Sequence, residues 1–361
     1  MRLLRILLCS IAGSMPVVLP AMERVLVAED GSGFVLSESG ERFRPWGVNY
    51  DHDADGRLIE DYWHGEWATV AADFGEIKAL GANVVRVHLQ LGKFMKNAEK
   101  PAQRELARLG DLLKLAERTG LYLDLTGLGC YHKADVPGWY DALDESERWK
   151  VQARFWSAIA KCCADSPAVF CYDLMNEPVL PGKDGESEWL LGELAGKFFV
   201  QRIALNQAGR DRKAIAKAWI ESLVDAIRTE DQHHLITVGV IPWAMVWPKA
   251  KPIFHDPEVG RRLDFVSVHF YPEGDIDKAL AALKVYDLGK PVVVEEFFPL
   301  KCSGEQMEKF LGGAGDIADG WMSFYWGKPA AEYPKDELKG ALIADWLRRF
   351  EERSPRMTGS N

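Results

Sequence analysis

Residues 71–89, AADFGEIKALGANVVRVHL, contain one predicted helix followed by one predicted strand. Apolar residues recur at helical spacing over residues 71–80, the turn signal Leu80-Gly81-Ala82-Asn83 follows, and β-branched residues dominate residues 83–89. The same alternation repeats along the chain. It predicts strands at residues 44–49, 83–89, 121–126, 169–175, 235–240, 265–270, 291–296 and 321–326. It predicts helices at residues 71–80, 103–118, 146–163, 212–229 and 336–350.

Eight strand–helix units in roughly 300 residues predict an α/β fold, the (β/α)8 or TIM barrel. A doubly wound open sheet is the rival, and it would more often carry a glycine-rich phosphate turn after its first strand. That turn here reads WGVNYD at residues 46–51, which lacks the fingerprint. Residues 24–40 predict a short N-terminal hairpin that caps the bottom of the barrel. Residues 178–210 predict a long insertion that lies over the opposite, catalytic face.

Polar residues gather where the predicted strands end, which is where TIM barrels carry their functional groups. The fourth strand ends in Asn176-Glu177-Pro178, and the seventh ends in Glu295-Glu296-Phe297. Two carboxylates on facing strands suit the cleavage of a glycosidic bond, in which one protonates the leaving oxygen and the other attacks the anomeric carbon or activates water. The 13 Trp residues of the chain also point mildly to carbohydrate.

This arrangement resembles the retaining glycoside hydrolases of family 5, the cellulase family within barrel glycosidase clan A, over about residues 34–350. Asn176-Glu177-Pro178 matches the family's acid/base signature, and Glu296 before an aromatic residue matches its nucleophile. Further active-site positions are matched by Arg86, His269, Tyr271 and Trp326. The chain departs from the family at Phe298, where glycine is usual, and at Thr126, where many members carry histidine.

The resemblance implies hydrolysis of a β-linked glucan or mannan, as polysaccharide or oligosaccharide, by double displacement, without a metal or cofactor. Glu177 would be the acid/base and Glu296 the nucleophile. Asn176 would bond the sugar 2-hydroxyl, Tyr271 would orient Glu296, and His269 would contact the substrate or the acid. Trp326 would form the platform under the reacting sugar. Weaker platform candidates are Trp46, Trp63, Trp139 and Trp243.

Strand parity separates Glu296 from its neighbour Glu295. Side chains alternate along a strand, so we expect Val292, Val294 and Glu296 to line the barrel and Glu295 to lean toward the helices or the rim. The same parity places Arg86 inside the barrel, where an unpaired charge is costly. Arg86 therefore requires a carboxylate partner, and Glu296 is the natural one.

Two other classes of barrel protein remain as alternatives. A noncatalytic carbohydrate-binding barrel would be expected to lose one of the two carboxylates, and both are present. A metal-dependent hydrolase would carry paired histidines after the first strand, where only His52 stands. Residues 51–56, DHDADG, copy half of a calcium loop, but the position of its final glutamate holds Tyr62, which favours a solvated rim loop near sugar hydroxyls.

The beginning of the chain has the pattern of an export signal. Arg2 and Arg5 give the chain a basic start, and residues 6–21 are mostly apolar but too short and broken to span a bilayer. We expect a signal peptide at residues 1–21, a single catalytic barrel at residues 22–361, and a secreted or periplasmic monomer; a buried N-terminal arm is the alternative. A net charge of −10 without a long basic run makes nucleic acid an unlikely partner.

Overall fold

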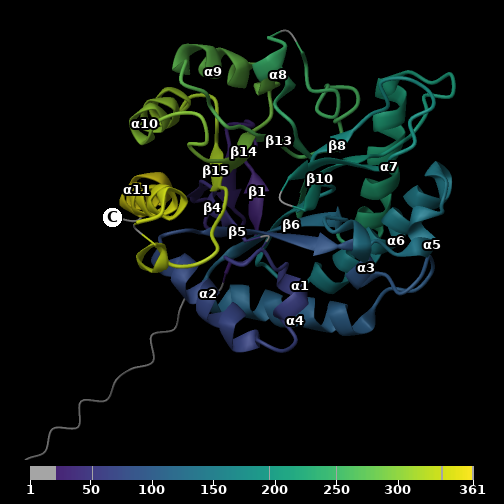
Figure 1. Ribbon diagram of the computed structural model, residues 1–361, viewed down its shortest axis with the longest axis horizontal. Helices are drawn as coiled ribbons and strands as arrows, with labels where there is room; N and C mark the ends of the chain where they lie inside the picture. Colours follow the sequence, from purple (N-terminus) through teal and green to yellow (C-terminus); the bar gives the residue numbers. More distant parts are fainter. Residues whose placement is uncertain (1–21, 51, 195, 249, 335, 360–361) are drawn as a thin grey trace, which may run out of the picture.

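Helices surround a closed ring of parallel strands in the computed structural model (Figure 1). It describes residues 22–50, 52–194, 196–248, 250–334 and 336–359, so the predicted signal at residues 1–21 lies outside the described part. The ring consists of β4 (Trp46–Asn49), β5 (Val84–Gln90), β6 (Tyr122–Gly129), β7 (Val169–Asp173), β11 (Leu235–Thr237) with β12 (Gly239–Val240), β13 (Val266–His269), β14 (Val292–Phe297) and β15 (Gly320–Ser323). Only Val238 separates β11 from β12, so these two short strands together occupy one position in the ring. The ring therefore has eight strand positions, and the predicted (β/α)8 barrel is confirmed.

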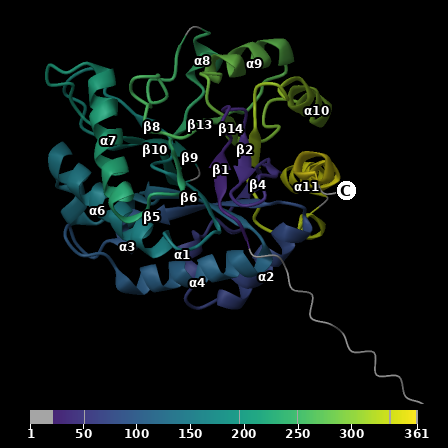
Figure 2. The same ribbon diagram turned by 180° about the vertical axis from the view of Figure 1, so that it is seen from behind.

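The longer helices follow the strands and pack on the outside of the ring (Figures 1 and 2). They are α2 (Trp67–Ala79), α4 (Gln103–Thr119), α6 (Glu145–Cys163), α7 (Arg212–Glu230), α9 (Ile276–Leu283), α10 (Gly304–Gly313) and α11 (Leu338–Thr358). Short helices occupy the connections: α1 (Ile59–Tyr62), α3 (Leu91–Phe94), α5 (Gly138–Asp141) and α8 (Trp243–Val246). The main hydrophobic core fills the space between the strands and these helices.

The turn between α2 and β5 shows why the opening stretch of sequence folds this way. Gly81 has a φ of +87°, and a Cβ at this position would lie 2.5 Å from the Cβ of Ser354. Only glycine satisfies both demands, since it tolerates positive φ and has no side chain. The turn therefore lets α2 end and β5 enter the barrel directly.

A small sheet closes the bottom of the barrel, as the sequence predicts. It contains β1 (Val25–Val27), β2 (Phe34–Leu36) and the additional strand β3 (Arg42–Phe43). In the view from behind, β1 and β2 lie across the centre of the ring (Figure 2). Phe34 packs edge-on against Phe170 and Phe265, which point into the barrel from the strands. The hairpin thus fills the lower barrel with apolar side chains.

The insertion after β7 forms a second small sheet. Its strands are β8 (Pro178–Val179), β9 (Leu190–Leu194) and β10 (Lys197–Arg202), with β10 in the middle. The backbone N–H of Phe198 donates to the carbonyl of Tyr131, just beyond the end of β6, over 2.8 Å. The insertion therefore lies at the carboxyl ends of the strands. Among the described residues, no helix is both long and apolar enough to cross a membrane.

Candidate active site

Arg86 is the centre of a polar network at the carboxyl ends of the strands. Its guanidinium is buried and donates to Glu296 Oε1 over 2.7 Å and to Asn49 Oδ1 over 2.9 Å. It also donates to Asp173 Oδ2 over 2.8 Å and to Asn176 Oδ1 over 3.0 Å. Burial alone would lower the pKa of Arg86, but the surrounding carboxylates raise it well above its ordinary value. The network thus contains a permanent positive charge.

Glu177 lies just beyond β7 in a backbone conformation unusual for a residue with a side chain. Its φ is +48°, and its N–H donates to the carbonyl of Gly239 over 3.0 Å. Its Oε1 is 3.0 Å from Nδ1 of His269. Strained backbone of this kind persists where the surroundings hold it in place, and it clusters at functional sites. With 17% of its side chain exposed, Glu177 is accessible from the catalytic face.

Glu296 faces Glu177 across His269. The hydroxyl of Tyr271 donates to Glu296 Oε2 over 2.6 Å, and His269 Nδ1 lies 3.5 Å from Glu296 Oε1. One carboxylate oxygen of Glu177, one of Glu296 and a ring nitrogen of His269 all lie within 4.8 Å of one another. Retaining glycosidases place their carboxyl groups about 5–5.5 Å apart, whereas inverting enzymes need about 6.5–9.5 Å for a water molecule. The separation suits a retaining mechanism.

His269 is fully buried, and the carboxylates around it favour the protonated, positively charged imidazole. Burial alone would lower its pKa, but Glu296 and the hydrogen bond to Glu177 raise it to about 10. Its Nε2 lies 3.6 Å from Glu295 Oε2, so the ring stands between three carboxylates. The imidazole thus lies between the two facing glutamates and contacts both of them.

The predicted parity of β14 is wrong. Val292 and Val294 belong to the core that faces the helices, whereas Val293 belongs to the apolar cluster inside the barrel. Glu295 is therefore the inward residue, and it is completely buried near Arg86. The register with β13 and β15 shifts at this point, which is a β-bulge, and the bulge turns Glu296 inward as well. Both glutamates thus point into the barrel, with Glu296 next to the catalytic face.

A layer of buried acids lies beneath Glu296, and the sequence-based prediction missed it. Asp124 of β6 and Glu295 are fully buried, with a carboxylate oxygen of each within 4.8 Å of the other. Burial and the charge of Glu295 raise the pKa of Asp124 well above its ordinary value. Burial would raise the pKa of Glu295 too, but Arg86 lowers it to about 2. These opposite shifts favour a protonated Asp124 beside an ionised Glu295.

Asp173 joins this layer from the last position of β7. Burial and Glu295 raise its pKa to about 6, and Thr126 donates a hydrogen bond of 2.9 Å to its Oδ2. Thr126, at the position where the family often carries histidine, thus contacts an acid inside the barrel. The sequence offered one signal that Asp124 and Asp173 point into the barrel. It was the alternation of side chains in LDLTG (residues 123–127) and at the end of β7.

Trp326 does not join the site, so its predicted platform role does not fit its position. It is only 1% exposed and packs edge-on against Tyr50, with its other side toward a hollow between α2 and α11. Phe324 is the half-buried aromatic that flanks the site, in edge contact with Tyr271. Of the weaker Trp candidates, Trp46 and Trp63 are buried in the core, whereas Trp243 is 40% exposed.

Comparison with known proteins identifies the family. The model of the cellulase family, glycosyl hydrolase family 5, matches residues 36–329. This chain belongs to glycosyl hydrolase family 5. Mannan endo-1,4-beta-mannosidase A of Podospora anserina is 23% identical over 271 residues, which cover 67% of this family 5 chain and 59% of the relative. The match thus spans about three fifths of that curated relative's length.

Solved structures share the fold of this family 5 chain at low sequence identity. An exo-β-1,4-mannosidase from Opitutaceae bacterium strain TAV5 is 18% identical with a TM-score of 0.66, covering 92% of this chain and 62% of its own. The β-mannanase of the blue mussel Mytilus edulis is 16% identical with a TM-score of 0.61, covering 93% and 97%. The endoglucanase catalytic domain of Thermobifida fusca is 18% identical with a TM-score of 0.59, covering 92% and 98%. These matches show the barrel fold.

The family 5 site also contains a group of side chains that are spaced like metal ligands. Glu177, His269 and Glu296 are close enough to share an ion, but His269 would first have to lose its proton. At the rim, Asp53 of the calcium-like loop accepts hydrogen bonds from Arg57 and from the backbone of Asp55. These contacts support the interpretation as a rim loop, while Asp51 lies outside the described residues.

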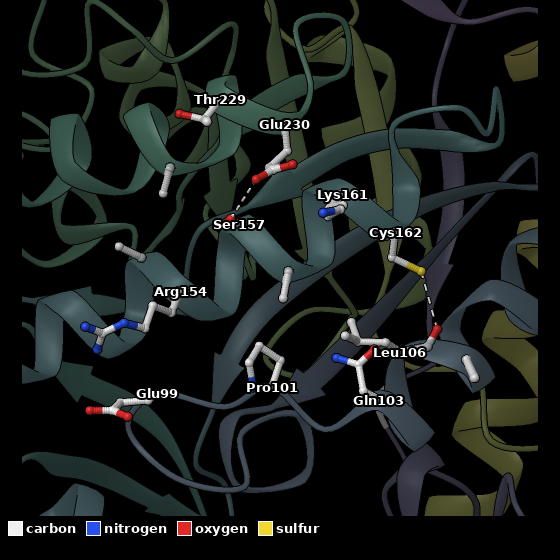
Figure 3. Close-up of a pocket in the computed structure, with 14 residues that line it drawn as sticks. Glu99, Pro101, Gln103, Leu106, Arg154, Ser157, Lys161, Cys162, Thr229 and Glu230 are labelled. Atoms are coloured by element: carbon white, nitrogen blue, oxygen red, sulfur yellow. Dashed lines mark hydrogen bonds between the residues drawn. The ribbon is translucent and has the colours of Figure 1, made fainter.

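A hollow of about 800 Å³ lies away from this site, on the outer surface between α4, α6 and α7 (Figure 3). Within it, Ser157 donates to Glu230 and Cys162 donates to the carbonyl of Leu106. None of the polar residues around Arg86 lines it. The hollow is a groove between helices, and the candidate active site remains the polar network at the carboxyl ends of the strands.

Proposed function

We propose that this protein is a retaining β-glycosidase that hydrolyses O-glycosidic bonds of a β-linked polysaccharide or oligosaccharide of mannan or glucan type. The observation that carries the proposal is the approach of the carboxylates of Glu177 and Glu296 to within 4.8 Å. Family membership supports the same chemistry. Of the four relatives named above, three have names that refer to mannan or mannosides and one is named an endoglucanase, which supports the two substrate classes.

In the first step, Glu177 gives its proton to the glycosidic oxygen while Glu296 attacks the anomeric carbon. The leaving sugar departs with the proton, and an ester joins the remaining sugar to Glu296. Arg86 and Tyr271 each hold one oxygen of Glu296, which fixes the direction of attack. In the second step, ionised Glu177 takes a proton from water, which attacks the ester and releases the sugar with its original configuration.

Asn176 is suited to hold the sugar during both steps. Its Oδ1 accepts a hydrogen bond from Arg86, and its Nδ2 donates to the carbonyl of Phe199 over 2.8 Å. These two bonds fix the orientation of the amide. The second hydrogen of Nδ2 would reach the sugar 2-hydroxyl, a bond that strengthens in the transition state.

Export of the protein belongs to the proposal as well. The basic and apolar pattern of residues 1–21 supports a signal peptide and a secreted or periplasmic monomer, with residues 22–361 as its single catalytic domain. Sequencing the N-terminus of protein recovered outside the cytoplasm tests this: cleavage near Ala21 is expected, and an intact Met1 would contradict it.

The stereochemical test uses dinitrophenyl β-mannoside and β-glucoside. Proton NMR should show the β-anomer as the first product on the substrate that is cleaved, and a first-formed α-anomer would contradict the mechanism. Glu177→Ala should still form the ester, because dinitrophenolate needs little acid help, and added azide should restore turnover as β-glycosyl azide. Glu273→Gln, which removes an exposed rim carboxylate, is the control and should behave like the unaltered protein.

A further inference from the structure

A second pocket begins at Pro178, the residue that follows Glu177 in the chain. It has a volume of about 590 Å³ and lies between the β8–β10 sheet and the α8 segment, with Pro178 on one wall and Trp243 and Trp247 on the other. The two tryptophans are 40% and 58% exposed, and their ring centres are 5.4 Å apart at an angle of 34°. Exposed apolar surface of this kind marks a binding site, and flat indole faces suit the faces of sugar rings.

The rest of the pocket lining is polar enough for sugar hydroxyls. Arg202 of β10 pairs with Glu186 over 2.8 Å and with the carbonyl of Glu188 over 2.7 Å. Arg212, at the start of α7, lines the same pocket and is exposed. Fixed charged groups beside aromatic surface provide orientation and contact area together, which is the usual composition of a ligand pocket.

The other side of the catalytic face is bridged by the β9–β10 hairpin. Beyond the end of β6, Phe198 donates through its backbone to Tyr131, and the rings of Phe199 and Tyr131 lie 5.4 Å apart. Gln201 Nε2 donates to the carbonyl of Leu128 over 2.9 Å. The hairpin is thus fastened by hydrogen bonds and ring contact where an open groove would need free space.

Lys197 carries this bridge to the loop that follows β4. Its side chain is buried, with 6% exposure, and its Nζ lies 3.8 Å from the position that a Cβ on Gly56 would occupy. The insertion therefore starts at Pro178 after β7, passes the end of β6, and reaches the first loop of the barrel. That path runs across the carboxyl ends of the strands on the side of β4–β6.

We propose that the enzyme removes sugars from the non-reducing end of its substrate and that the pocket lined by Trp243 and Trp247 holds the leaving part of the chain. The inference rests on the proposed function. Since Glu177 protonates the leaving oxygen, the leaving sugars lie on the side where Pro178 opens into the pocket. The sugar bound to Glu296 then has its other end toward the β9–β10 hairpin, which in this proposal stops a longer chain.

The products from end-labelled oligosaccharides test this directly. We would incubate the enzyme with β-1,4-linked mannohexaose and cellohexaose, each carrying 2-aminobenzamide at the reducing end. Exo action predicts that labelled products shorten from the unlabelled end, with a free monosaccharide or disaccharide as the first sugar released. Labelled products cut at internal positions from the start would overturn the inference.

A glycosyl fluoride separates the failure of this inference from the failure of the proposed function. β-Mannosyl and β-glucosyl fluorides need no leaving sugar, so they report the catalytic residues alone. Hydrolysis of a fluoride with internal cleavage of the hexasaccharides overturns only the exo inference. No hydrolysis of any of these substrates by folded protein overturns the proposed function, and the exo inference with it.

Variants test the tryptophan pocket and the β9–β10 hairpin separately. Trp247→Ala should raise the KM for the cleaved hexasaccharide about tenfold and leave fluoride hydrolysis within twofold, because only the longer substrate reaches the pocket. Leu338→Ala, which removes an exposed apolar side chain on α11, is the matched control and should change neither. Equal effects of Trp247→Ala on both substrates would contradict the pocket assignment.

Replacing residues 191–200 by a short Gly-Ser turn should open the hairpin side and add internal cleavage. If that variant does not fold, Lys197→Ala serves in its place, and it should yield detectable internal products from the hexasaccharide. Folded variants whose products remain unchanged would contradict the role of the hairpin.

Discussion

The two ends of the barrel interior are built from opposite kinds of side chain. At the bottom, Phe34 from the N-terminal sheet meets Phe170 and Phe265 at ring distances of 5.3 and 5.4 Å. At the top, Arg86 and His269 stand among buried carboxylates such as Glu295. The same strands run through both layers, so the two layers share one backbone framework and differ only in the side chains that point into the barrel.

This difference separates the requirements of folding from those of catalysis. The bottom layer stabilises the fold simply by removing aromatic surface from water. The top layer gains nothing from burial itself, since each charge loses its hydration, and it persists only because each acid has a cation or a proton nearby. Breaking one contact should therefore cost stability alone at the bottom, but stability and activity together at the top.

The largest effect is expected for Arg86→Met. This change leaves Asp173, Glu295 and Glu296 without their shared cation, and breaking a buried charge network costs about 3–5 kcal/mol. Urea unfolding should show the loss, and hydrolysis should become undetectable. Arg348→Met, which removes an exposed pair with Asp345 on α11, is the control and should leave both nearly unchanged. A stable, active Arg86→Met protein would contradict the role of the Arg86 network in stability and activity.

Phe34→Ala should affect stability without affecting chemistry. Removing a buried phenyl ring leaves a cavity in the bottom layer, which costs about 3 kcal/mol. The kcat of the folded variant should stay within twofold, because the catalytic carboxylates lie at the other end of the barrel. Urea unfolding and initial rates measure the two quantities. A large fall in kcat at full folding would show that the two layers are coupled.

A smaller effect is expected from pH. Because the folded-state pKa of His269 is raised to about 10, its contribution to stability is complete below its ordinary pKa near 6.5 and declines as the pH rises toward 10. The free energy of unfolding should therefore fall by about 2–3 kcal/mol between pH 7 and pH 9. His269→Gln should flatten that slope. A wild-type stability that rises over the same range would contradict a charged His269.

The sequence predicts the barrel and most of the top layer where the strands are regular. In β5 the alternation of Val84, Arg86 and His88 holds, so the position of Arg86 inside the barrel follows from parity alone. In β14 the bulge adds a second consecutive inward residue, and parity gives the wrong face for Val292, Val294 and Glu295. A bulge depends on pairing with neighbouring strands, so a single strand's sequence does not reveal it.

Loop geometry was the second limit. The eighth strand ends at Ser323, before its predicted end, so Phe324 reaches the site while Trp326 turns into the core. The insertion after β7 was recognised by its length, but its sheet and its contact with Tyr131 depend on long-range pairing. Family resemblance located Glu177 and Glu296, whereas the inward position of Glu295 becomes visible only once the strands are paired.

Covalent trapping tests the central claim most directly, namely that the bulge presents Glu296 to the substrate while Glu295 stays buried. The protein would be treated with 2-deoxy-2-fluoro-β-mannosyl and β-glucosyl fluorides, digested, and sequenced by fragmentation mass spectrometry. The fluorine slows the second step, so the ester should accumulate on the nucleophile. We predict a single fluorosugar on Glu296, and Glu296→Ala should abolish it. A fluorosugar on Glu295 would contradict the account.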